Sequence, residues 1–129
     1  MIYLSDSPDG NGIINLTVGD DASIEINLTT DDGAKYNMGN NEYLIFNVRE
    51  KASEQSPLLI DLRSDLGSNE IIFSHDDTKD LSPGYYSAEV QFMGEDGKRI
   101  TVWPKQEGNA KTSQANRKNF CLMSEVVYE

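Results

Sequence analysis

Cysteine, histidine and tryptophan are scarce in this chain, and each occurs once in 129 residues. The single cysteine, Cys121, cannot form a disulfide within the chain, which fits a reducing compartment. A serine or cysteine triad would need His75 as its base, and nothing in the sequence marks Cys121 as an activated thiolate. We interpret His75 as a residue at a helix start and Cys121 as a partly buried side chain. The sequence therefore predicts no catalytic residues and a protein that is not an enzyme.

Long apolar runs are also missing. No stretch of 18 apolar residues is present, so the sequence predicts no transmembrane helix. The N-terminal residues MIYLSDSPDG lack the basic region and the apolar region of a secretory signal. We therefore expect a protein made in the cytoplasm without a signal peptide.

Basic residues are few compared with acidic residues. The chain holds 11 basic and 22 acidic residues, which gives a net charge of −11. This balance argues against binding to a nucleic-acid backbone and disfavours anionic membrane surfaces. We expect neither nucleic acid nor membrane as a partner.

Paired aspartates raise the question of a calcium site, because calcium takes carboxylate oxygens as ligands. The pairs are Asp20-Asp21, Asp31-Asp32 and Asp76-Asp77, with Asp80 nearby. No stretch follows the D-x-[DN]-x-[DN]-G loop of a single-loop site. We interpret these aspartates as solvated turn formers and predict no metal and no cofactor.

The basic residues gather in one stretch, KQEGNAKTSQANRKN, at residues 105–119. This stretch carries +3, so the rest of the chain carries −14. A solvated loop is one interpretation. The other is a basic arm whose Lys111, Arg117 and Lys118 contact the acidic surface of a neighbouring copy. Structureless stretches of this length in compact domains are usually functional or disordered.

The chain is organised around a predicted hairpin from Ser82 to Pro104. Its first strand alternates apolar and polar residues, and the Asp-Gly pair in the turn Glu95–Lys98 is a strong hairpin signal. Pro104 ends the return strand because proline cannot donate to a ladder.

Further short alternating segments predict the remaining strands. We expect them at Ile13–Val18, Ile24–Leu28, Tyr43–Glu50, Leu58–Leu62, Glu70–Ser74 and Phe120–Tyr128, with Met1–Leu4 as a candidate edge strand and Tyr36–Met38 as a candidate return strand. His75–Leu81 is predicted as one helical turn with Asp76 or Asp77 as its N-cap.

Eight or nine short strands, with a turn signal about every ten residues, are typical of an all-β protein. The pattern predicts an antiparallel β-sandwich of the immunoglobulin-like type, in one domain that spans residues 1–129. The Cys…Trp…Cys spacing of antibody domains is absent. Every second residue of a strand points to the same face, and the apolar residues at these alternate positions predict the core. The predicted core residues are Ile24, Ile26, Leu28, Leu44, Phe46, Val48, Tyr86, Ala88, Val90, Phe92, Ile100 and Val102.

The order of turns and strands from Ile13 to Pro104 resembles a known family. The matching features are Gly19-Asp20, Asp31-Asp32-Gly33, the strand Tyr43–Glu50, Leu81-Ser82-Pro83-Gly84-Tyr85-Tyr86, Ala88-Glu89-Val90, Asp96-Gly97-Lys98, Thr101 and Pro104. In this order the chain is similar to the immunoglobulin-like N-terminal domain of phage baseplate upper proteins. The long basic stretch before the last strand departs from that pattern.

The resemblance implies a non-enzymatic structural component of a phage particle, made in the bacterial cytoplasm and located in the virion. Its position is left open between the tail baseplate, a tail-fibre attachment and capsid decoration. Its partners would be other copies of itself and other virion proteins.

Exposed strand edges need protection, so we expect Met1–Leu4 or Phe120–Tyr128 to pair with or pack on another subunit. The candidate interface residues are Tyr3, Trp103, Lys111, Arg117, Lys118, Phe120 and Leu122.

The alternative function is a carbohydrate-binding module or adhesin on a phage or bacterial surface, with a host-surface glycan as its ligand. Tyr3, Tyr43, Tyr85 and Trp103 would supply the aromatic platform on which the sugar stacks. The favoured interpretation is that Trp103 covers an edge of the sandwich or fills an interface.

Overall fold

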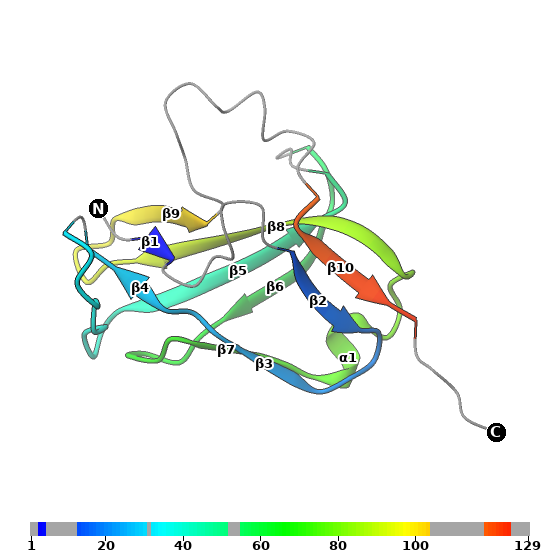
Figure 1. Cartoon of the computed structure of the whole chain (residues 1–129), viewed down its shortest axis with the longest axis horizontal. Helices are drawn as coiled ribbons and strands as arrows, with labels where there is room; N and C mark the ends of the chain where they lie inside the picture. The colour runs from blue at the N-terminus through cyan, green and yellow to red at the C-terminus, as the bar shows by residue number, and fades with distance from the viewer. Residues whose placement is uncertain (1–2, 5–12, 31, 52–54, 104–117, 125–129) are drawn as a thin grey trace.

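The strands of this protein form one large sheet and two small ones (Figure 1). The computed structural model describes residues 3–4, 13–30, 32–51, 55–103 and 118–124. The strands are β1 (Tyr3–Leu4), β2 (Ile14–Thr17), β3 (Ala22–Glu25), β4 (Leu28–Thr29), β5 (Tyr43–Arg49), β6 (Leu58–Arg63), β7 (Glu70–Phe73), β8 (Gly84–Met93), β9 (Arg99–Trp103) and β10 (Phe120–Met123). One short helix, α1 (His75–Thr78), precedes β8. The predicted all-β class is confirmed.

The large sheet has the order β2-β10-β8-β5-β6, and β9 pairs with β8 as the second half of the predicted hairpin. Its pairs are antiparallel with one exception. β2 and β10 run parallel, with Ile14 opposite Phe120 and Thr17 opposite Met123. The prediction of a purely antiparallel fold was therefore wrong, because it considered only pairs of neighbouring segments, whereas β2 and β10 are far apart in the sequence.

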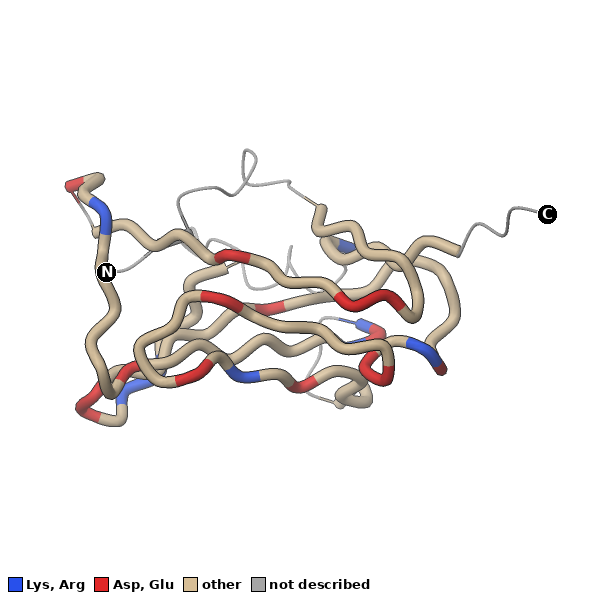
Figure 2. The backbone as a smooth tube through the Cα atoms, turned by 90° about the horizontal axis from the view of Figure 1, so that it is seen from below, with Lys and Arg blue, Asp and Glu red and all other residues tan. Residues whose placement is uncertain are grey.

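The small sheets pair β3 with β7 and β1 with β4, both antiparallel. The ring of Phe73 in β7 meets the ring of Phe46 in β5 edge-on, with centroids 5.5 Å apart. The same Phe73 ring lies 6.2 Å from Phe120 in β10. The β3–β7 pair therefore packs on one face of the large sheet, and Figures 1 and 2 show this layered arrangement.

The core lies between these layers. Ten of the twelve predicted core residues are buried, and Ile24 and Ile100 pack partly buried against them. The prediction that these alternate residues of each strand lie on its core-facing side is therefore confirmed. Full burial of an aliphatic or aromatic side chain contributes about 1.5–3 kcal/mol, so this alternation is a main source of stability.

The predicted strand Ile24–Leu28 is divided into β3 and β4 because the segment changes partners. The Ile26 N–H donates to the Asn69 carbonyl at 2.8 Å, and the Asn69 side-chain amide donates to the Ile26 carbonyl at 3.1 Å. Before this point the segment pairs with β7, and after it the segment pairs with β1.

The predicted return strand Tyr36–Met38 does not form among the described residues. An isolated bridge joins Thr29 to Lys35, and the Tyr36 N–H donates to the Leu28 carbonyl. The Tyr36 ring instead packs edge-on against Phe92, with centroids 5.7 Å apart.

The helix α1 begins at His75, as predicted, but its N-cap is Ser74. The carboxylate of Asp77 accepts hydrogen bonds from the Ser74 N–H at 2.7 Å and from the Ser74 hydroxyl at 3.1 Å. Asp77 is thus the third helical residue, which reaches back to the cap as in a capping box. The prediction of Asp76 or Asp77 as the N-cap was wrong.

The turn between β2 and β3 docks on α1. The His75 Nδ1 atom lies 2.6 Å from the Gly19 carbonyl oxygen, and the Gly19 N–H donates to the Thr78 hydroxyl at 2.8 Å. The His75 N–H donates to a carboxylate oxygen of Asp21 at 2.8 Å. His75 therefore has a structural role at the helix start, as predicted.

A tyrosine joins the segment after α1 to the start of β8. The Tyr86 hydroxyl donates to the backbone carbonyl of Ser82, four residues earlier. This contact fixes the bend by which the chain leaves α1 and enters the large sheet.

Candidate functional site

Three of the candidate interface residues belong to the core. Trp103 is 3% exposed, Phe120 0% and Leu122 1%. The register between β8 and β9 shifts at Val90, where Val102 is an extra residue, and both Val102 and Trp103 pack in the core. β10 lies between β2 and β8, so Phe120 and Leu122 also face the core. The assignment of these three residues to a subunit interface is corrected accordingly.

The other candidate interface residues have different positions. Tyr3 pairs with Thr29 in the β1–β4 sheet, and Lys118 is exposed just before β10. Lys111 and Arg117 lie outside the described residues. The hypothesis of a basic arm at residues 105–119 therefore stays a prediction.

The described part of the last strand offers no free edge to another subunit, because β10 pairs with β2 on one side and with β8 on the other. Tyr3–Leu4 pairs with β4 within the same chain. Residues 1–2 and 125–129 of the predicted terminal strands lie outside the described residues.

The aromatic residues proposed for a carbohydrate platform do not form one surface. Trp103 is buried, whereas Tyr43 and Tyr85 lie near opposite ends of the β5–β8 pair. At about 3.3 Å per residue, the eight residues from Tyr85 to the Met93 partner of Tyr43 span roughly 26 Å. A stacking platform that includes Trp103 is therefore absent from the described structure.

The paired aspartates hold turns. The carboxylate of Asp32 accepts hydrogen bonds from the Thr30 hydroxyl and the Ala34 N–H, and the bond from Thr30 is the main cause that lowers the pKa of Asp32. Asp21 and Asp77 hold the two sides of the α1 start. No group of three or more histidine, cysteine or acidic residues within the described ranges is arranged to hold a metal ion.

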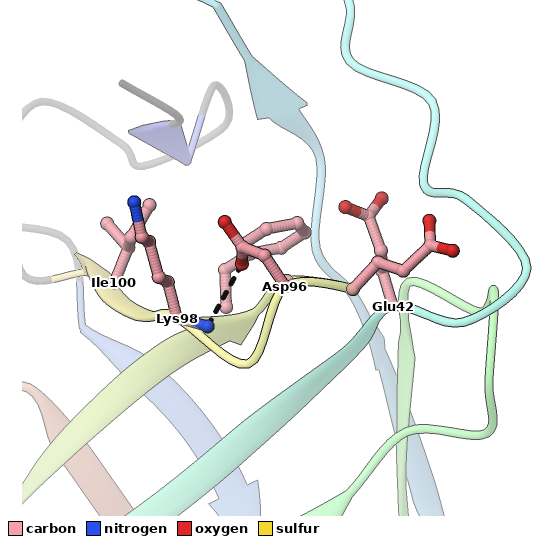
Figure 3. A pocket seen from close by; sticks show the side chains of 7 residues that line it. Glu42, Asp96, Lys98 and Ile100 are labelled. Atoms are coloured by element: carbon pink, nitrogen blue, oxygen red, sulfur yellow. Dashed lines mark hydrogen bonds between the residues drawn. The ribbon is translucent and has the colours of Figure 1, made fainter.

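A cavity of about 310 Å³ lies at the tip of the β8–β9 hairpin, where the start of β5 comes close to the turn. Its lining residues are Glu42, Phe92, Gly94, Glu95, Asp96, Lys98 and Ile100. The labelled side chains of Glu42, Asp96, Lys98 and Ile100 point to the same side (Figure 3). This cavity is our candidate site, and we call it the hairpin pocket.

The hairpin turn positions one side of the pocket. The Gly94 N–H donates to the Lys98 carbonyl at 2.9 Å, and the Gly97 N–H donates to the Gly94 carbonyl at 3.0 Å. Gly97 has a φ of 82°, a conformation that glycine adopts without a steric cost. The Asp96 carboxylate accepts the Lys98 N–H at 3.0 Å, which fixes that carboxylate within the turn.

Glu42 forms the other side and is held more firmly. The Tyr36 hydroxyl donates to its carboxylate, whose two oxygens lie 2.7 and 3.0 Å away. The Gly39 N–H donates to the same carboxylate at 2.7 Å. Burial, followed by the hydrogen bond and charge of Glu42, raises the pKa of Tyr36 to about 12. Tyr36 therefore stays a neutral donor to Glu42 at physiological pH.

The pocket combines negative charge with an apolar lining. The lining includes three carboxylates, those of Glu42, Glu95 and Asp96, and one ammonium group, that of Lys98, which gives a net charge of −2. Phe92 and Ile100 supply the apolar surface. A volume near the lower limit of about 300 Å³ for ligand sites suits a group the size of a side chain. Lysine and arginine fit this chemistry, because their aliphatic stems pack on apolar surface while their charged ends bind carboxylates.

Sequence analysis singled out the Asp-Gly turn at residues 96–97 but not Glu42. The signal that was missed is the pairing of Tyr43 with Met93, which places Glu42 beside the hairpin turn. This register follows from β5 and β8 being neighbours, which a single sequence does not state.

Comparison with models of protein families and with curated proteins found no match to this chain. Within the residues that the structure describes, no helix is long and apolar enough to cross a membrane.

Proposed function

We propose that this chain is an immunoglobulin-like module that acts through protein–protein contacts as a structural component of a phage particle. Tail baseplate, fibre attachment and capsid decoration are all compatible with this role. The proposal joins the family resemblance of residues 13–104 with the arrangement of the described strands.

The strand order supports the immunoglobulin-like assignment. The order β10-β8-β5-β6 corresponds to the G-F-C-C′ part of a variable-type sheet, and β3–β7 corresponds to the B–E pair of the opposite sheet. The unpredicted parallel β2–β10 pair extends the first sheet at its β10 edge.

The observation that carries the assignment is the contact between Tyr86 and Ser82. In immunoglobulin domains a tyrosine near the start of strand F donates from its hydroxyl to a backbone group a few residues upstream. Tyr86 occupies this place in β8, two residues before Ala88, which is buried where antibody domains carry the second cysteine. This corner makes the fold implied by the resemblance the best explanation of the topology.

The hairpin pocket supports a binding role over a catalytic one. Its lining contains no histidine, cysteine or serine, and the hydrogen bonds of Glu42 and Asp96 serve to position these carboxylates. A set of fixed carboxylates around an apolar surface is suited to recognition by charge and shape.

The proposal is tested on purified phage or prophage particles from the organism that encodes the chain. An antibody to the protein should label one structural location in electron micrographs, and mass spectrometry should find its peptides in the same particles. Particles from a strain in which the gene is deleted serve as the control. Particles that carry neither label nor peptides would overturn the proposed function.

A further inference from the structure

We propose that the hairpin pocket binds lysine or arginine side chains from the basic segment, residues 105–118, of a second copy of this chain. The inference rests on the assembly role proposed above and names the contact through which copies associate. The donors considered are Lys105, Lys111, Arg117 and Lys118.

The charge of the pocket selects this partner. The lining carries a net charge of −2, and the acidic residues of the described chain are spread over many strands and turns (Figure 2). The chain therefore repels most of its own surface. Residues 105–119, with +3, are the one long stretch of the sequence that carries opposite charge. Complementary charge both guides encounter and excludes wrong partners.

Two of the three carboxylates are fixed before a ligand arrives. Tyr36 and Gly39 hold Glu42, and the Lys98 N–H holds Asp96. Glu95 is the least constrained, since its described contact is with the Asn41 side-chain amide at 3.4 Å. Preorganised acceptors reduce the entropy that binding costs.

The apolar lining explains why the ligand is a side chain and not a bare ion. Phe92 is buried and Ile100 half-buried at the base of the pocket. The aliphatic stem of a lysine or arginine covers such surface while its nitrogen atoms reach the carboxylates.

The segment is attached to the described fold at two points. It leaves at Trp103, three residues along β9 from Ile100 of the pocket lining, which is about 10 Å at the usual rise per residue, and it returns at Lys118 and Asn119. The Asn119 N–H donates to the Tyr86 carbonyl, and Tyr86 lies seven residues along β8 from Met93, roughly 23 Å at the usual rise per residue. The return point at Asn119 therefore lies away from the pocket of the same copy, whereas Trp103 lies near it, and the concentration dependence of the contact distinguishes a neighbour's segment from the copy's own.

The arrangement has a consequence for symmetry. The pocket and the attachment points of the segment are different surfaces, so each copy would donate to one neighbour and accept from another. Such head-to-tail contacts close into rings or continue as filaments. Each exposed charge contact is weak, so association would depend on several contacts acting together.

The test measures self-association of the full chain by analytical ultracentrifugation at low salt. Glu95→Lys should weaken association at least tenfold, because it changes the net charge of the pocket from −2 to 0 and removes only the 3.4 Å hydrogen bond from Asn41. The matched control is Glu25→Lys, which makes the same change at an exposed position of β3. The control should stay within twofold of wild type. Raising the ionic strength should weaken the wild-type association.

Charge reversal in the basic segment tests the other side of the proposed contact. The triple variant K111E/R117E/K118E should weaken association as strongly as Glu95→Lys. Mixing the two variants should give a complex that contains both more readily than either variant associates alone, because the acidic segment of one variant then meets a pocket that is no longer negative. As a second measurement, a synthetic peptide of residues 105–119 added to the labelled wild-type chain should shift the amide resonances of Phe92 and Ile100.

Several outcomes would overturn the proposal. They are a wild-type chain that stays monomeric, a Glu95→Lys variant that associates normally, and peptide shifts located elsewhere. Loss of association in Glu25→Lys alone would assign the contact to β3 and β7 instead. Pocket resonances that change in the triple variant independently of concentration would assign the segment to its own copy. A chain found in particles whose Glu95→Lys form assembles normally would leave the proposed function standing while this inference fails.

Discussion

Asn119 binds both backbone groups of Ala88 with one side chain. Its Oδ1 atom accepts the Ala88 N–H at 2.6 Å, and its Nδ2 atom donates to the Ala88 carbonyl at 2.9 Å. The side-chain amide thus takes the place of a strand partner at the point where β10 begins. Asn119 was predicted as the last residue of a polar loop, but it is buried and belongs to the sheet.

Replacing this residue tests its role. Asn119→Ala leaves two buried backbone groups without partners, and each such group costs about 1–3 kcal/mol. We expect the free energy of unfolding to fall by roughly 2–4 kcal/mol, as measured by urea denaturation. The neighbouring exposed Lys118→Ala should change it by less than about 0.5 kcal/mol. Equal stability of the two variants would show that the amide contacts contribute nothing.

The contact between Tyr86 and Ser82 can be tested with a matched pair of adjacent residues. Tyr86→Phe removes the hydroxyl that donates to Ser82 and should lower stability by about 1 kcal/mol, the usual net value of one hydrogen bond. Tyr85 is 55% exposed, so Tyr85→Phe should have almost no effect. Chemical denaturation measures the free energy of unfolding of both variants. A larger decrease in Tyr85→Phe than in Tyr86→Phe would contradict a stabilising role of the Tyr86 hydroxyl.

A buried charge tests which side chains of β8 point into the core. Val90 is completely buried at the centre of the core, so Val90→Asp should prevent cooperative folding. Leu66→Asp introduces the same charge at a position that is 64% exposed and should leave the fold intact. Circular dichroism during heating distinguishes these results. A folded Val90→Asp with the wild-type melting temperature would mean that β8 faces the other way.

The partly buried hydroxyl of Tyr36 predicts the response to alkali. Its pKa rises from 10.0 to about 12 on folding, so the unfolded chain loses this proton first. The stability from Tyr36 is complete below pH 10 and is lost as the pH rises from 10 towards 12. Spectrophotometric titration should show late-ionising tyrosines, with Tyr36 among them, because burial also raises the pKa of Tyr86.

Glu42→Gln should lower the pKa of Tyr36 only in part, because burial is the larger cause of the shift and remains in the variant. Asp61→Asn, at an exposed position on β6, should leave the titration unchanged. A titration curve of Glu42→Gln identical to that of wild type would show that Glu42 does not contribute to the raised pKa of Tyr36.

Much of the fold could be predicted because local chemistry determines it. Alternation in β5 and β8 identifies the buried face, and the Asp-Gly turn locates the β8–β9 hairpin. The facing of Trp103 could not be predicted in this way. The extra residue Val102 breaks the period of two, and nothing in the sequence marks the bulge.

The hairpin pocket and the parallel pair depend on contacts between distant segments. Glu42 meets the turn at residues 94–98 only because β5 and β8 are neighbours in a particular register. Likewise, Ile14 pairs with Phe120 across most of the chain. Hydrophobic periodicity describes each strand separately and contains no information on which strands become neighbours.

The parallel pair also determines when the large sheet can be completed during synthesis. β2 is made among the first strands, yet its partner in the large sheet, β10, is made last among the described strands. Until residues 120–123 leave the ribosome, the apolar side chains of β2 lack that neighbour and β8 lacks one of its own. Contacts this distant in sequence close slowly. The growing chain is therefore most exposed to aggregation and proteolysis just before β10 emerges, and a translational pause before Phe120 would prolong that interval.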